Sequence, residues 1–66
     1  MINRLRLPTM RQLEKMGSGD AGAVLDYQES EYKIILGQLT DPNDRRRIRK
    51  AIRRVQKRRD EFFGDN

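Results

Sequence analysis

Seven basic side chains near the end of the chain have the spacing of residues that share one face of a helix. The stretch 41–63 holds ten of the fifteen lysine and arginine residues. At about 100° per residue, one arc of a helix collects the seven: Arg46, Arg49, Lys50, Arg53, Arg54, Lys57 and Arg58. The guanidinium group is a planar fork of donors that can bind two oxygens of one phosphate. These seven residues are therefore the candidate nucleic-acid-binding residues.

The opposite arc of the same stretch is apolar, which predicts a helix over 41–63 with one buried face. Its members recur at the i, i+3, i+4, i+7 spacing of an amphipathic helix: Ile48, Ala51, Ile52, Val55 and Phe62. Asp41 is expected to cap this helix with its side chain, and Pro42 suits the first helical position. Gly64 is expected to end the helix in a left-handed conformation. Arg59 lies within the apolar arc, so we expect its stem to cover apolar surface while its guanidinium reaches solvent.

The charge of the chain is concentrated in this helix. The net charge is +5, yet residues 1–43 carry five basic and six acidic side chains, whereas residues 44–66 carry ten basic and four acidic. The basic arc has almost no acidic residues at helical spacing, so its charges repel one another unless a partner neutralises them. This asymmetry indicates an anionic partner. The arc lacks the asparagine, glutamine and serine pattern that reads base edges, which favours structured RNA over DNA.

Composition excludes several classes of function. The chain has no cysteine and no histidine, which removes disulfides, the common zinc sites, thiol nucleophiles and the commonest general base. We therefore predict a protein that is not an enzyme, with no catalytic residue, no metal site and no cofactor. No apolar run approaches the roughly 20 residues that span a bilayer, and the N-terminal residues do not resemble a secretory signal. The expectation is a cytoplasmic protein with no membrane partner.

The N-terminal third is expected to hold an arm, a short helix and a break. Residues 1–8 predict an extended arm whose Leu5 and Leu7 pack onto the first helix, the alternative being phosphate contact through Arg4 and Arg6. Residues 9–16 predict a short helix, because Thr9 and Gln12 fit the capping-box pattern. The glycine-rich triplet at 17–19 predicts a loop or hinge.

Residues 20–39 predict a second helix, with Asp20 as its cap. A core stripe runs along it, which Gln28 interrupts at one turn: Leu25, Tyr32, Leu36 and Leu39. Tyr27 and Ile34 fall on the opposite side, where they mark either a partner contact or ordinary exposed apolar residues. The very short connection to the helix at 41–63 predicts antiparallel neighbours. The predicted fold class is thus all-α: one small domain over 1–66, an antiparallel helical hairpin with a short N-terminal helix and an extended arm.

The run 37–57, GQLTDPNDRRRIRKAIRRVQK, resembles the bacterial large-subunit ribosomal protein twenty-nine family. The resemblance is carried by a Gly-Gln-Leu, an Asp-Pro turn and a basic helix with an Ile/Val core pattern: Gly37, Gln38, Leu39, Asp41, Pro42, Ile48, Arg49, Ile52, Arg54 and Val55. The chain departs from the family where glycines interrupt the first long helix, and at Arg53 and Lys57. The resemblance implies a hairpin on large-subunit ribosomal RNA near the nascent-chain exit. It places the RNA contacts on six of the seven basic residues, Arg58 being the exception.

Two other classes of function compete with RNA binding. The first is a small dimeric regulator, of a phage or plasmid type, that binds an acidic protein partner; the thin core and the Tyr27 and Ile34 pair favour it. The second is a homodimeric DNA-binding regulator that uses the basic helix. The two-residue connection weighs against the second, because it folds the helices back instead of crossing them as in a helix-turn-helix.

Overall fold

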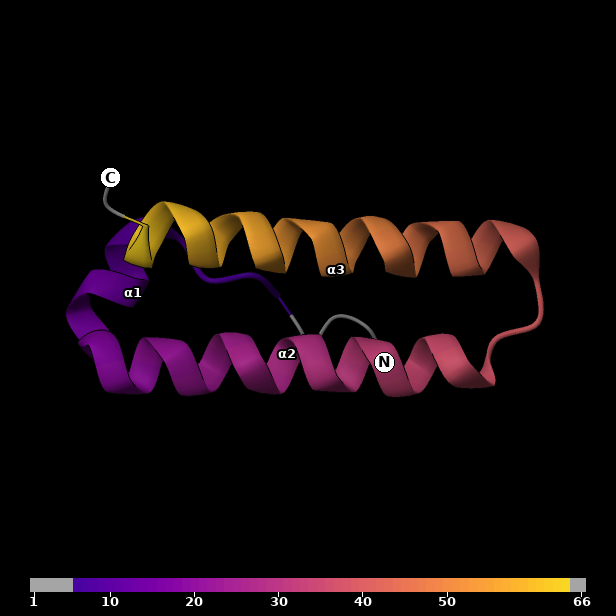
Figure 1. Ribbon diagram of the computed structural model, residues 1–66, viewed down its shortest axis with the longest axis horizontal. Helices are drawn as coiled ribbons and strands as arrows, with labels where there is room; N and C mark the ends of the chain where they lie inside the picture. Colours follow the sequence, from indigo (N-terminus) through magenta and orange to yellow (C-terminus); the bar gives the residue numbers. More distant parts are fainter. Residues whose placement is uncertain (1–5, 65–66) are drawn as a thin grey trace.

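The computed structural model describes residues 6–64, which form three helices and no strand. The helices are α1 (Met10–Met16), α2 (Ser18–Gln38) and α3 (Pro42–Phe63). The two long helices α2 and α3 lie antiparallel as a hairpin, and α1 sits at the end of the hairpin remote from the connecting turn (Figure 1). The predicted fold class, an all-α helical hairpin with a short N-terminal helix, is confirmed.

The first helix begins with the capping box that the sequence predicts. The Thr9 side-chain oxygen accepts a hydrogen bond from the Gln12 amide at 3.1 Å, and the Gln12 side chain accepts one from the Thr9 amide at 2.9 Å. Two amide groups that a helix start leaves without partners are thereby satisfied. The cap sets the direction of α1 and turns the fully buried Leu13 toward the long helices.

The break between α1 and α2 is a single residue, Gly17, and not the expected triplet. Gly17 has φ +90° and ψ 161°, a region that is essentially open to glycine alone. Its amide donates to the carbonyl of Leu13 at 3.2 Å, and its carbonyl accepts from the amide of Ala21 at 2.9 Å. Because Gly17 closes one helix and opens the next, Ser18 and Gly19 are already helical. Asp20 therefore lies in the first turn of α2, and the expectation that it caps this helix is wrong.

The turn between the long helices is closed by an arginine. Pro42 occupies the start of α3 as expected, but the Asp41 side chain makes no capping hydrogen bond. The end of α2 is instead capped from α3: Arg45 Nη1 donates to the carbonyls of Leu36 at 2.8 Å and Leu39 at 3.0 Å. This contact satisfies carbonyl groups that a helix end would otherwise leave unpaired. One arginine of the basic helix thus stabilises the fold.

The core lies between the facing stripes of the two long helices and the underside of α1. Its buried apolar members come from all three helices: Leu13, Ala21, Leu25, Tyr32, Ile48 and Val55. Partly buried residues extend it along both stripes: Leu7, Met10, Ile35, Leu36, Leu39, Ala51, Ile52 and Phe62. The predicted stripes are confirmed. At the far end of α3, Gly64 is extended, not left-handed, and the Asp60 carbonyl oxygen occupies the place of a side chain there.

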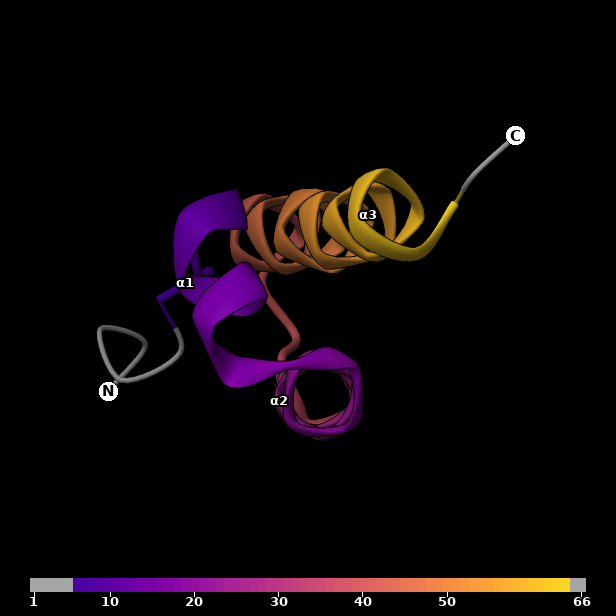
Figure 2. The ribbon, with the colours of Figure 1, turned by 90° about the vertical axis from the view of Figure 1, so that its left-hand side faces the viewer.

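The arm and α1 together cover one side of the hairpin. Viewed along the long helices, α1 lies beside the plane that contains α2 and α3 (Figure 2). The Gln28 side chain, buried in the core, donates to the carbonyl of Arg6 at 2.7 Å, so the residue that seemed to interrupt the stripe holds the arm. Leu7 packs against the core and Pro8 is buried, as expected of a packed arm. Arg4 and Leu5 lie outside the described residues.

Among residues 6–64, no helix is both long and apolar enough to cross a lipid bilayer.

Candidate nucleic-acid interface

The ten basic residues of α3 divide into two groups by what their side chains contact. Three of them donate to groups within the fold: Arg45, Arg58 and Arg59. The other seven are exposed and make no hydrogen bond or ion pair with any residue of the described part of the chain: Arg46, Arg47, Arg49, Lys50, Arg53, Arg54 and Lys57. We call these seven the cationic face. The division separates the charges that hold the helices together from those that are open to a partner.

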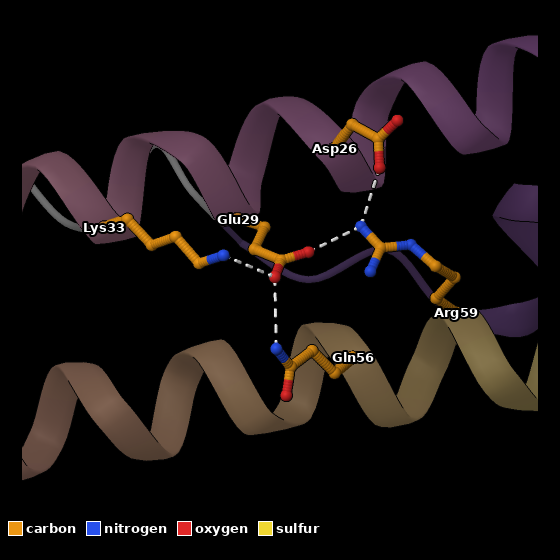
Figure 3. Close-up of polar contacts among 5 residues, drawn as sticks. All are labelled: Asp26, Glu29, Lys33, Gln56 and Arg59. Atoms are coloured by element: carbon orange, nitrogen blue, oxygen red, sulfur yellow. Dashed lines mark hydrogen bonds and ion pairs between the residues drawn. The ribbon is translucent and has the colours of Figure 1, made fainter.

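Arg59 is the centre of a polar cluster that joins the long helices (Figure 3). Its Nη2 atom lies 2.7 Å from a carboxylate oxygen of Asp26 and 2.7 Å from one of Glu29, both on α2. The Arg59 side chain remains 29% exposed, so its guanidinium lies at the surface and finds its acceptors there. A guanidinium inside an apolar arc has to find acceptors, and the acidic side chains of α2 supply them.

Glu29 receives three donors in this cluster. Besides Arg59, its carboxylate accepts a hydrogen bond from Gln56 Nε2 at 3.1 Å and pairs with Lys33 Nζ at 3.1 Å. The hydrogen bonds from Gln56 and Arg59 lower the pKa of Glu29 from 4.5 to about 2, although partial burial opposes them. The hydrogen bond with Glu29 likewise raises the pKa of Arg59. Both groups thus stay charged at neutral pH, and their opposite charges compensate each other across the two helices.

Arg58 differs from the other six predicted binding residues. Its side chain is 26% exposed, and its guanidinium donates to the Pro8 carbonyl of the arm and, at 3.3 Å, to Glu61. This arginine fastens the arm to α3 across fifty positions of sequence. The sequence could not show this, because the acceptor is a backbone carbonyl remote in the chain.

Arg47 was not among the predicted binding residues, yet it belongs to the cationic face. It is exposed, and it lies seven positions from Arg54, which places the two on the same side of α3 two turns apart. The i, i+7 spacing was available as a signal in the sequence. Arg47 also borders an apolar hollow of about 180 Å³ near the turn, which Ile35, Leu39 and Ile48 line together with Asp44.

The cationic face runs from Arg46 to Lys57, about 16 Å along the helix axis at 1.5 Å per residue. It ends where Asp60 and Glu61 bring negative charge. Arg54 lies near the buried Tyr32: burial raises the pKa of Tyr32, and the positive charge of Arg54 opposes that rise. The face is therefore a continuous array of donors with acidic groups only at its margin.

A groove of about 260 Å³ lies at the edge of the face, where the arm meets α3. Leu7 forms its apolar wall, and the polar lining comes from Arg54, Lys57, Arg58 and Glu61. Because Arg58 is held by Pro8, one wall of this groove has a fixed guanidinium. The groove lies between the arm and the cationic face, so the surface is concave at this end.

Comparison with known proteins gives no significant match: no protein-family model, no curated protein and no solved structure matches the chain.

Proposed function

We propose that this protein binds structured RNA through the cationic face of α3. The observation that carries the proposal is the division of charges within one helix. Arg45, Arg58 and Arg59 have acceptors inside the fold, whereas the seven residues of the cationic face have none among residues 6–64. Like charges one turn apart destabilise a helix. An anionic partner removes this cost, and phosphate is the anion that arginine forks fit best.

RNA is favoured over DNA by the geometry of the surface. The long helices run antiparallel, so α3 does not cross a neighbour in the manner of a recognition helix (Figure 1). The side-chain amide of Gln56 on α3 is occupied by Glu29. A face whose seven members are all arginine or lysine suits phosphate contacts along the shape of a folded RNA.

A place in the large ribosomal subunit is the finer form of this proposal. It rests on the resemblance of residues 37–57 to the bacterial large-subunit ribosomal protein twenty-nine family. Cosedimentation of the tagged protein with 50S particles through a sucrose gradient at moderate salt tests it. Recovery with the particles supports the ribosomal role, and recovery at the top of the gradient refutes it while leaving RNA binding open.

The experiment that tests RNA binding is a salt titration with three ligands: an RNA hairpin, a DNA duplex of the same stem sequence, and heparin. Seven phosphate contacts predict a slope of log affinity against log salt of about −5 to −6. Tighter binding to the RNA than to both other ligands is the expected result. Equal affinity for all three would mean non-specific attraction, and absence of binding would turn attention to an acidic protein partner.

A matched pair of variants assigns the binding to the face. The double variant Arg49→Glu and Arg53→Glu reverses two charges on the cationic face, whereas Arg11→Glu with Lys15→Glu makes the same change in net charge on exposed positions of α1. The first pair is expected to abolish RNA binding at 150 mM salt, and the second to weaken it only modestly. Equal loss in both would show that net charge alone, and not this face, attracts RNA.

A further inference from the structure

The outward side of α2, away from α3, carries a second apolar stripe. Tyr27 and Ile34 are 61% and 56% exposed and lie seven residues apart. Small exposed residues continue the line at 4-3-4-3 spacing: Ala23, Ser30 and Gly37. This is the spacing at which two helices pack along a seam. We call the line through these five residues the outer seam.

We propose that the outer seam packs against the outer seam of a second copy of this chain, antiparallel, to form a symmetric dimer. A symmetric pair is self-complementary, so a single stripe supplies both surfaces. With the two-fold axis at Ser30, Tyr27 of one copy lies opposite Ile34 of the other, and this contact is made twice. The hydroxymethyl group of Ser30 and the absence of a side chain at Gly37 let the helix axes approach closely. Large residues thus face large ones on either side of the axis, and small residues face small ones at the axis and near the ends of the seam.

Charges beside the seam select the antiparallel arrangement and the second copy as occupant. Asp26 and Lys33 flank the seam on one side. Each already pairs within its own chain, Asp26 with Arg59 and Lys33 with Glu29, yet both side chains remain mostly exposed and open to a second contact. In an antiparallel pair, Asp26 of each copy lies near Lys33 of the other, which gives two attractive contacts against one repulsive pair of Glu31 side chains at the axis. In a parallel pair, Asp26 of each copy would instead face Glu31 of the other, so both contacts would repel.

The dimer has a consequence for RNA binding. This consequence rests on the proposed function, whereas the dimer itself does not. The outer seam and the cationic face lie on opposite sides of the hairpin, because each is on the side of its helix away from the buried stripes that α2 and α3 share. Figure 2 shows the two helices one above the other. Two copies joined at α2 therefore present their cationic faces outward in opposite directions. Such a dimer can bridge two RNA segments, whereas a monomer binds one.

Cysteine cross-linking tests the seam directly, because the chain has no cysteine of its own. Ser30→Cys places a thiol at the proposed axis, and Lys50→Cys places one on the cationic face as a control. Under mild oxidation without RNA, Ser30→Cys is expected to form a covalent dimer at least ten times faster than Lys50→Cys. Equal rates would overturn the proposal.

Mixed cysteine variants test the direction of the pair. In an equal mixture of Ala23→Cys and Gly37→Cys chains, an antiparallel seam gives mainly the mixed disulfide, which intact mass identifies. Homodisulfides in excess would refute the antiparallel arrangement.

Sedimentation equilibrium without RNA gives the second, independent measurement. The unmodified protein is expected to show a dimer mass, and Ile34→Glu a monomer mass with unchanged helicity by circular dichroism. A monomer mass for the unmodified protein up to 1 mM would refute the dimer even if RNA binding is intact. A dimer that binds no RNA would refute the proposed function alone.

Discussion

The guanidinium of Arg59 on α3 binds the carboxylate of Glu29 on α2 at 2.7 Å, in a cluster that joins the two long helices on the side shown in Figure 3. The arm and α1 close another side of the hairpin with apolar residues and backbone acceptors. The thin core between the long helices is thus bordered by two different kinds of contact. The ionic contacts make the stability of the fold depend on pH, whereas the apolar and backbone contacts of the arm do not.

Acid is expected to weaken the fold through Glu29. The folded-state pKa of about 2 lies below the ordinary value of 4.5. A depressed pKa means that the stabilisation is fully present above about pH 4.5 and is lost as the pH falls toward 2; screening by solvent at this surface cluster reduces it to on the order of 1–2 kcal/mol. Thermal melts between pH 2 and 7 should show this fall, and Glu29→Gln should flatten it. Glu14→Gln on exposed α1 is the control, and acid sensitivity that survives Glu29→Gln would contradict the assignment.

Two glycines two positions apart are expected to respond to alanine in opposite directions. Gly17 has φ +90°, which alanine adopts only with strain, so Gly17→Ala should lower the free energy of unfolding by about 1–3 kcal/mol. Gly19 is helical with open space where a side chain would stand, so Gly19→Ala should raise it by about 0.5–1 kcal/mol. Urea unfolding measures both. Equal effects would show that the break extends beyond Gly17.

These two glycines show where sequence reasoning ends. Periodicity predicted both long helices and both core stripes, because apolar spacing reports directly on which face is buried, and the capping box predicted the first helix. It could not say which of the two glycines of the triplet breaks the helix, since both tolerate the required backbone. It also read Gln28 as a gap in the stripe, because its acceptor, the Arg6 carbonyl, belongs to a segment that tertiary structure brings near.

The candidate site was predictable only as a set of charges on one arc. The sequence placed Arg58 with the binding residues, since its helical position is all that the sequence shows. Its contact with Pro8 depends on where the arm packs. Arg59 was placed within the apolar arc, but its partners Asp26 and Glu29 lie on another helix and could not be identified from the sequence. Only the tertiary contacts show which arginine residues are held within the fold and which are open to a partner.

The buried stripe of α3 is expected to be uneven in its contribution to stability. Ile48 is 2% exposed, whereas Ile52 is only partly buried. Ile48→Ala should therefore cost about 2–5 kcal/mol, and Ile52→Ala distinctly less. At about 4–8 °C per kcal/mol for a domain of this size, thermal denaturation resolves the two. A larger loss for Ile52→Ala would mean that the hairpin is rotated from the described packing.

Arg53 and Arg58 provide the sharpest test of the division between available and structural cations. Arg53→Met removes a charge from the cationic face, so it should reduce the salt slope of RNA binding by about 0.7–0.9 and leave the melting temperature unchanged. Arg58→Met keeps the apolar stem but removes the donor to Pro8. It should leave the salt slope nearly unchanged, lower the melting temperature, and speed hydrogen exchange at the amide of Leu7. Identical changes in salt slope for the two variants would place Arg58 among the residues that contact phosphate, and would show that fastening the arm does not remove it from the interface.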